Sequence, residues 1–133
     1  MNIEDYILKQ PSDRQDLLTR IHNVIIASDK TVEAKVQPMM GKDMIVYKAS
    51  GAFKYGLANV KNYISLHVLP VYSSKNLHSK YKTLLPMANF QKGCINFKNE
   101  SQMPLQILEA LIEESSKIDL LKIREQYLRS KQK

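Results

Sequence analysis

Five side chains suited to binding a ligand lie close together in the sequence. They are Lys54, Lys61, Tyr63, Ser65 and His67. Lysine contributes positive charge, serine and histidine contribute hydrogen bonds, and tyrosine contributes an aromatic ring. Phosphate is attracted to lysine and a planar base stacks on tyrosine, so these groups together suit an anionic partner. The sequence therefore predicts an acidic or phosphate-bearing partner, and nucleic acid is one form that such a partner could take.

These side chains share a surface only if the strands that carry them form a sheet. Side chains alternate between the two faces of a strand, so all of these residues except Lys61 are expected on one face. Tyr47 or Lys48 joins them, according to the register of the preceding strand. The alternative is that a helix covers this face, in which case Tyr63 and His67 are half-buried packing residues.

The sequence contains few residues that could carry out catalysis. Cys94 is its one cysteine, and it could act as a nucleophile only if the fold placed a histidine beside it. A free cysteine in an apolar strand is more often a small core residue. The three histidines have no metal-ligand spacing and the four glycines do not cluster, so neither a zinc site nor a phosphate-binding glycine loop is predicted. We expect a protein that is not an enzyme and has no resident cofactor.

A second hypothesis is that the chain binds iron. Glu4, Asp13 and Asp16 lie near the N-terminus, and the two aspartates would share a helix face. Converging carboxylates bind hard cations. The competing explanation is that acidic residues in a first helical turn stabilise the helix by opposing its dipole.

The net charge of +7 is concentrated in the middle of the chain. Residues 1–33 hold four basic and six acidic side chains, and residues 100–133 hold six of each. Residues 34–99 hold ten lysines and one acidic residue, Asp43, which gives this segment a net charge of +9. Such a field favours anionic partners, although lysines on strands also aid solubility and block edge-to-edge pairing.

Length and composition indicate one globular domain over residues 1–133. Hydrophobic residues make up 44% and charged residues 25% of the chain, which is ordinary for a soluble protein. There is neither a run long enough to span a membrane nor a basic segment followed by an apolar one. With a single cysteine the expected location is the cytoplasm, and both a monomer and a homodimer remain open.

The fold class predicted from these patterns is α+β, with an antiparallel sheet of about four strands. Three strands form a meander over residues 44–49, 52–60 and 63–69, joined by turns at Ser50-Gly51 and Lys61-Asn62, and the fourth covers residues 94–98. Alternation places Phe53, Tyr55 and Leu57 on the apolar face of the second strand. Residues 31–36 are ambiguous between a helical turn and an extended segment.

In sequence order, helices are expected before the meander, between its last strand and the fourth strand, and after the fourth strand. A short helix over residues 2–10 precedes an amphipathic helix over residues 13–28. Another is expected over residues 73–85, and a C-terminal helix begins at Pro104 and runs to 118 or further, with a frayed tail over 129–133.

Residues 15–118 carry a family resemblance. The runs that show it are GAFKYGLANVKNYISLHVLPVY, KYKTLLP, GCINFKN and MPLQILEALIEES. They resemble the YdhG-like family of bacterial domains of unknown function, and the most specific part is residues 57–72, which include Lys61, Leu66 and His67. The resemblance implies a small α+β domain with an antiparallel sheet and packed helices, usually standing alone in the cytoplasm.

One branch of that family is described as frataxin-like and handles intracellular iron, so the resemblance implies an iron chaperone as an alternative function. The chain departs from this branch in its basic middle segment. Tyr63 also stands where many relatives carry a histidine. The resemblance supplies no catalytic residue.

Overall fold

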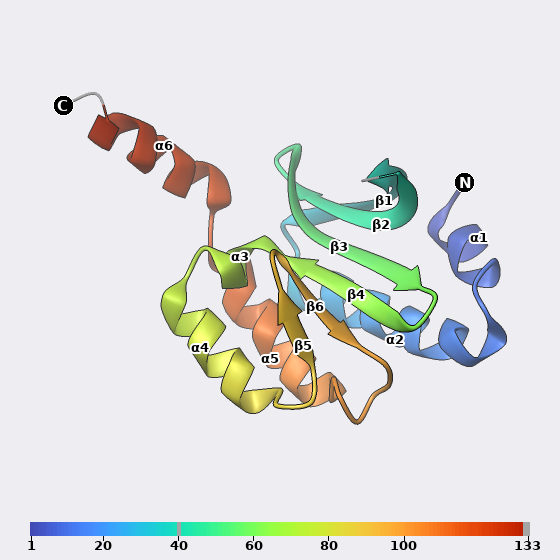
Figure 1. The fold of residues 1–133 in the computed structure, drawn as a ribbon. Helices are drawn as coiled ribbons and strands as arrows, with labels where there is room; N and C mark the ends of the chain where they lie inside the picture. The colour runs from blue at the N-terminus through green and yellow to red at the C-terminus, as the bar shows by residue number, and fades with distance from the viewer. Residues whose placement is uncertain (40, 132–133) are drawn as a thin grey trace.

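A six-stranded antiparallel sheet forms the frame of the molecule (Figure 1). The computed structural model describes residues 1–39 and 41–131. The strands are β1 Val32–Met39, β2 Lys42–Ala49, β3 Ala52–Val60, β4 Tyr63–Val68, β5 Asn89–Gln91 and β6 Cys94–Phe97. Their order across the sheet is β1-β2-β3-β4-β6-β5, so the short β5–β6 hairpin extends the meander on the β4 side.

Helices cover one face of this sheet. These helices are α1 Ile3–Leu8, α2 Ser12–Ser28, α3 Leu69–Tyr72, α4 Lys75–Leu84 and α5 Leu105–Ser116, and a further helix, α6 Leu120–Lys131, packs on neither face. In Figure 1, α2 and α5 lie side by side behind the sheet, whereas α6 projects from the body. We call the sheet face against α2 and α5 the inner face and the opposite one the outer face.

The apolar periodicity of the sequence explains the inner layer. Leu17, Leu18, Ile21 and Ile25 recur at helical spacing in α2 and are all buried. They pack with the inner side chains of the strands, such as Leu57 of β3, and with α5. This helix-on-sheet layer buries the apolar surface that drives folding.

The predicted α+β fold and the meander are confirmed. The pairs Ala49↔Ala52 and Val60↔Tyr63 close the hairpins at the expected turns. Ser50 and Gly51 have φ of 51° and 80°, the left-handed values of a two-residue hairpin turn. The predicted strand 63–69 ends one residue early because Leu69 already begins α3.

The sheet has two strands more than the sequence indicated. Residues 31–36 belong largely to β1, whose pairing with β2 extends past Pro38 to Met39. Proline is tolerated there because β1 is an edge strand and needs no second ladder of hydrogen bonds. The other addition, β5, has only three residues and therefore no readable alternation.

The helices differ from prediction mainly at their ends. The helix expected over 73–85 is present as α4, which Ser74 caps through its side chain, and the short α3 precedes it. The C-terminal helix is divided, because α5 ends at Ser116 and Asp119 accepts from the backbone of Lys122 at the start of α6. Of the predicted tail, residues 129–131 belong to α6 and residues 132–133 lie outside the described residues.

A β-bulge at Lys54 overturns two predictions about β3. Tyr47 pairs with Tyr55 but Lys48 pairs with Phe53, so Lys54 is an extra residue. The bulge breaks the alternation on which the prediction depended. Phe53 was expected on the apolar inner face and lies on the outer face, whereas Lys54 was expected outside and points inward.

Lys54 lies in a buried ion pair. Its Nζ is 2.9 Å from Oδ2 of Asp29, and the two residues are 3% and 1% exposed. Tyr55 donates its hydroxyl to the same carboxylate at 2.7 Å, and Thr31 donates both its backbone N–H and its hydroxyl. Burial alone would raise the pKa of the Asp29 carboxyl, but the hydrogen bonds from Thr31, Lys54 and Tyr55 outweigh it and lower the pKa.

We predict that Lys54→Ala destabilises the protein by about 3 kcal/mol, because it leaves the Asp29 carboxylate buried without its cation. The loss is at the lower end of the usual range since Thr31 and Tyr55 still donate to the carboxylate. Lys48→Ala on the neighbouring strand is the control, with an expected change within about 0.5 kcal/mol. Denaturant unfolding at pH 7 measures both, and equal midpoints for the two variants would contradict a structural role for the ion pair.

Candidate functional site

The outer face of the sheet carries three of the five predicted ligand-binding residues. Tyr63, Ser65 and His67 alternate along β4 and point to this face, opposite the buried Ile64, Leu66 and Val68. Lys61 is exposed in the β3–β4 turn, next to the end of β4 that carries Tyr63. Figure 1 shows no helix over the face turned to the viewer among residues 1–39 and 41–131. The fold therefore leaves uncovered the surface on which the sequence placed its candidate site.

Phe53 takes the place on this face that was expected for Lys54. Its ring meets the His67 ring edge-on, with 6.3 Å between centroids. Phe53 also lies over Gly56, where an added Cβ would come within 2.9 Å of the phenyl ring. Gly56 is the cross-strand partner of His67, so the missing side chain at residue 56 lets the two rings meet.

An apolar patch continues from Phe53 toward the β1 edge. Met44, Val46 and Ala58 are buried on the outer face although no helix covers them, because Phe53 and Met39 pack against them. This small second core keeps β2 and β3 rigid on both faces. It also gives the Phe53 ring a fixed support, and only part of the ring remains exposed.

Lysines lie near the aromatic side chains. Lys48 is the cross-strand neighbour of Phe53, and Lys35 on β1 is on the same face, opposite Val46. Glu33 of β1 is the other cross-strand neighbour of Lys48, and Lys61 follows β3 at the end of the strand away from Phe53, near Tyr63. Lys54 does not contribute, since its charge is neutralised by Asp29 beneath the sheet.

Ser65 and Asn96 form the polar part of the outer face beside these rings. They are cross-strand partners on β4 and β6 and are each 6% exposed. Among the described contacts, Oδ1 of Asn96 has no hydrogen-bond partner. This oxygen is itself enclosed by protein atoms, so it adds polarity beneath the face and is not open to a ligand.

Cys94 lies opposite His67 on β6. The fold therefore supplies the histidine that a nucleophilic cysteine would require. No hydrogen bond joins the two side chains in the described part of the chain, and burial lowers the pKa of the His67 imidazole, which favours its neutral form. Cys94 instead contributes its backbone carbonyl, which accepts the Tyr72 hydroxyl at 2.7 Å.

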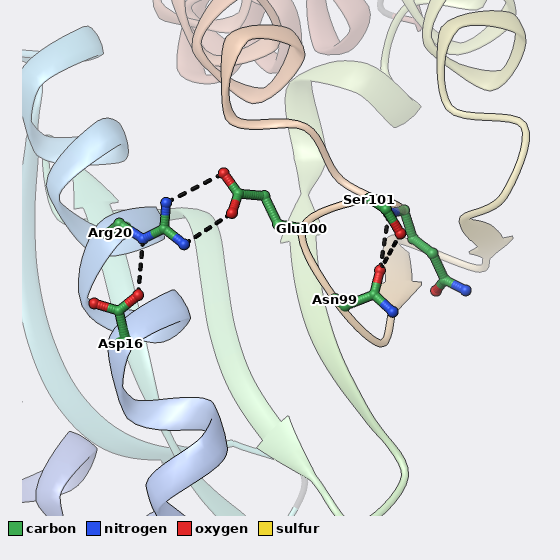
Figure 2. A network of polar contacts seen from close by, with 6 residues as sticks. Asp16, Arg20, Asn99, Glu100 and Ser101 are labelled. Atoms are coloured by element: carbon green, nitrogen blue, oxygen red, sulfur yellow. Dashed lines mark hydrogen bonds and ion pairs between the residues drawn. The ribbon is translucent and has the colours of Figure 1, made fainter.

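The carboxylates of the iron alternative do not converge. Glu4 is on α1, and Asp13 and Asp16 are on the first turns of α2. Figure 2 shows Asp16 bonded to Arg20, which also holds Glu100 through two hydrogen bonds of 2.8 and 3.1 Å. Within residues 1–39 and 41–131, no three side chains of His, Cys, Asp or Glu come together as metal ligands.

The loop that carries Glu100 is itself ordered by short polar contacts. Oδ1 of Asn99 accepts from the Ser101 hydroxyl at 2.6 Å and from the Gln102 backbone (Figure 2). Arg20 thus ties α2 to the connection between β6 and α5. Asp16 and Glu100 have a structural partner in Arg20, which explains two of the acidic residues without a metal.

Sequence reasoning missed two residues of the candidate site. Phe53 was assigned to the core because nothing in the sequence GAFKYG marks a bulge. Asn96 was included in a predicted strand, but its face could not be chosen because the partner of that strand was unknown. Its position between apolar Ile95 and Phe97 was the one available signal, since polar residues that alternate with buried ones face outward.

Comparison with known proteins does not identify the chain: no family model, curated protein or solved structure matches it. The resemblance to YdhG-like domains therefore stays a prediction. Among the described residues, none of the helices is long and apolar enough to cross a membrane.

We predict that the His67 imidazole titrates below its ordinary pKa of 6.5 and is neutral at pH 7. Since the folded-state pKa is lowered, the unfolded chain takes up the proton first, and His67 reduces stability as the pH falls below about 6.5. Two-dimensional NMR of the histidine side chains measures the midpoint, with His67→Gln assigning the signal. A midpoint at or above 6.5 would show that the ring is more solvated than its place between Phe53 and Cys94 implies.

Proposed function

We propose that this chain is a non-enzymatic binding domain for a phosphate-bearing partner, held on the outer face of the sheet. The observation that carries the proposal is the combination of partly exposed aromatic rings and lysines on one uncovered face. Tyr63, His67 and Phe53 supply the rings, and Lys48 and Lys61 supply the charge.

The arrangement suits a ligand with both a phosphate and a planar group. A nucleotide or a single-stranded nucleic acid has both. Aromatic side chains on a sheet can stack bases while nearby lysines attract the backbone phosphates.

Binding is favoured over catalysis by the chemistry of the same face. The one thiol, Cys94, has no hydrogen bond to His67 among the described contacts and so lacks an activated base. The lysines lie at the surface, where they hold an anion by attraction. We extend the proposal to membership of the YdhG-like family and to a cytoplasmic location, which the single cysteine supports.

Fluorescence anisotropy with a labelled oligothymidylate tests the proposal. We expect affinity to fall with salt, and Lys48→Ala and Lys61→Ala each to reduce the slope of log K against log salt by about 0.7. Tyr63→Ala should weaken binding by about 1–3 kcal/mol if the ring stacks on a base. Inorganic phosphate, a mononucleotide and an acidic protein, added as competitors, separate phosphate recognition from general attraction to negative charge.

Lys82→Ala is the matched control, because Lys82 is an exposed lysine on α4, away from the outer face. It changes the net charge equally but should leave the affinity within about twofold. Equal losses at Lys82 and Lys61, or binding that does not depend on salt, would refute a localised site. Thermal unfolding of each variant separates lost binding from lost stability.

A further inference from the structure

Beyond Leu120 and Leu121, which line a pocket with the β2–β3 hairpin, helix α6 has no partner in the described structure. Every residue from 121 to 131 is exposed, and none of the helix is buried. Figure 1 shows it as the red helix that projects from the body beyond α5. Residues 117–119 connect it to α5, and its start is fixed by Asp119, which accepts from the Lys122 backbone at 3.1 Å.

The exposed helix is amphipathic. Its apolar residues recur at spacings of three, four and seven along one side, as they do in helices that pack. They are Leu120, Leu121, Ile123, Tyr127 and Leu128. Ile123 is 43% and Tyr127 is 56% exposed, which is unusual for a pair four residues apart on the same stripe.

An isolated helix of this length is marginal in water. Helices shorter than about 12–15 residues gain too little from backbone hydrogen bonds to offset nucleation, and α6 has 12 residues. Most such helices are stabilised by packing of their apolar side. The apolar stripe of α6 therefore indicates that this helix packs against another surface, which would stabilise it.

A groove on the opposite end of the molecule has the matching chemistry. It lies between α1 and α2 and has a volume of about 620 Å³. Its lining consists of Ile3, Glu4, Ile7, Leu8, Gln15, Asp16, Thr19 and His22. The apolar part contains Leu8, which is 61% exposed, and the charged part is entirely acidic. The groove is therefore open and apolar, with carboxylates on both helices.

The charges of α6 and of this groove are complementary. Lys122, Arg124, Arg129 and Lys131 against Glu125 give the described helix a net charge of +3. Arg124 and Lys131 fall on the same side as the apolar stripe, where they would meet Glu4 of the groove, since Asp16 is already paired with Arg20. Apolar anchors flanked by opposite charges are the usual features of a helix bound in a groove.

The groove that receives α6 cannot belong to the same chain. Figure 1 shows α1 and α6 at opposite ends of the molecule. The three residues 117–119 span at most about 11 Å when extended, which is far less than the breadth of a domain of this size. We propose that α6 of one copy docks in the α1–α2 groove of a second copy. Because the two surfaces lie at opposite ends, an antiparallel pair makes both contacts at once and closes as a twofold dimer.

Sedimentation velocity of the full chain across a range of concentrations tests the proposal. We expect a monomer–dimer equilibrium that the double variant Ile123→Asp with Tyr127→Asp shifts to monomer. Gln126→Asp adds one negative charge to the opposite side of α6 and is expected to leave the equilibrium unchanged. Since α6 contributes no buried residue, none of these variants should lower the thermal stability of the monomer.

Charge exchange identifies the groove. Arg124→Glu and Glu4→Lys should each weaken the dimer about tenfold, because each change occurs twice in a symmetric dimer. The two changes combined in one chain should restore most of the affinity. Asp5→Lys is the control, since Asp5 is next to Glu4 on α1 but does not line the groove.

Four results would overturn the proposal. The first is a chain that stays monomeric at all concentrations. The second is a dimer that persists in the Ile123→Asp with Tyr127→Asp variant. The third is a monomer whose α6 binds vesicles of anionic phospholipid, because a basic amphipathic helix also suits a membrane surface. Failure of Arg124→Glu with Glu4→Lys to recover affinity would likewise exclude the α1–α2 groove as the docking site.

Discussion

The ion pair between Asp29 and Lys54 is the interaction on which the arrangement of the sheet depends. A buried charge is tolerated only when it is paired, so β3 must bulge at the one position where the lysine can reach the carboxylate. The bulge turns Lys54 inward, and Phe53 then takes the outer face. The chemistry of the outer face is thus determined by a carboxylate that follows α2, on the other side of the sheet.

This constraint marks the limit of what the sequence predicts. The repeat of Leu17, Ile21 and Ile25 and the alternation of Ile64, Leu66 and Val68 are local, and the helix and strand that they predict are present. The bulge is not local, because the residue that makes it favourable is 25 positions away from Lys54. Lys54, Tyr63, Ser65 and His67 were predicted to share one face of the sheet. This prediction failed at Lys54 alone, whereas Tyr63, Ser65 and His67 lie together as expected.

The charge asymmetry of the chain has a different meaning once it is placed on the fold. The lysines of the middle segment are not one patch. Lys54 is buried and Lys80 pairs with Glu114 at 2.6 Å on the helical side, whereas Lys35, Lys48 and Lys61 are distributed around the outer face. Acidic residues gather on α1 and the start of α2, at the end of the molecule away from α6. The molecule therefore has an acidic end and a basic end, a separation of charge that the net charge does not reveal.

The two edges of the sheet limit how this domain can meet a partner. At one edge β5 has three residues, and at the other β1 contains Pro38, which has no N–H to donate. Short edge strands and edge prolines prevent another chain from adding a strand. Recognition by backbone pairing is thus disfavoured at both ends of the sheet, and side chains on faces and helices are left to select what binds.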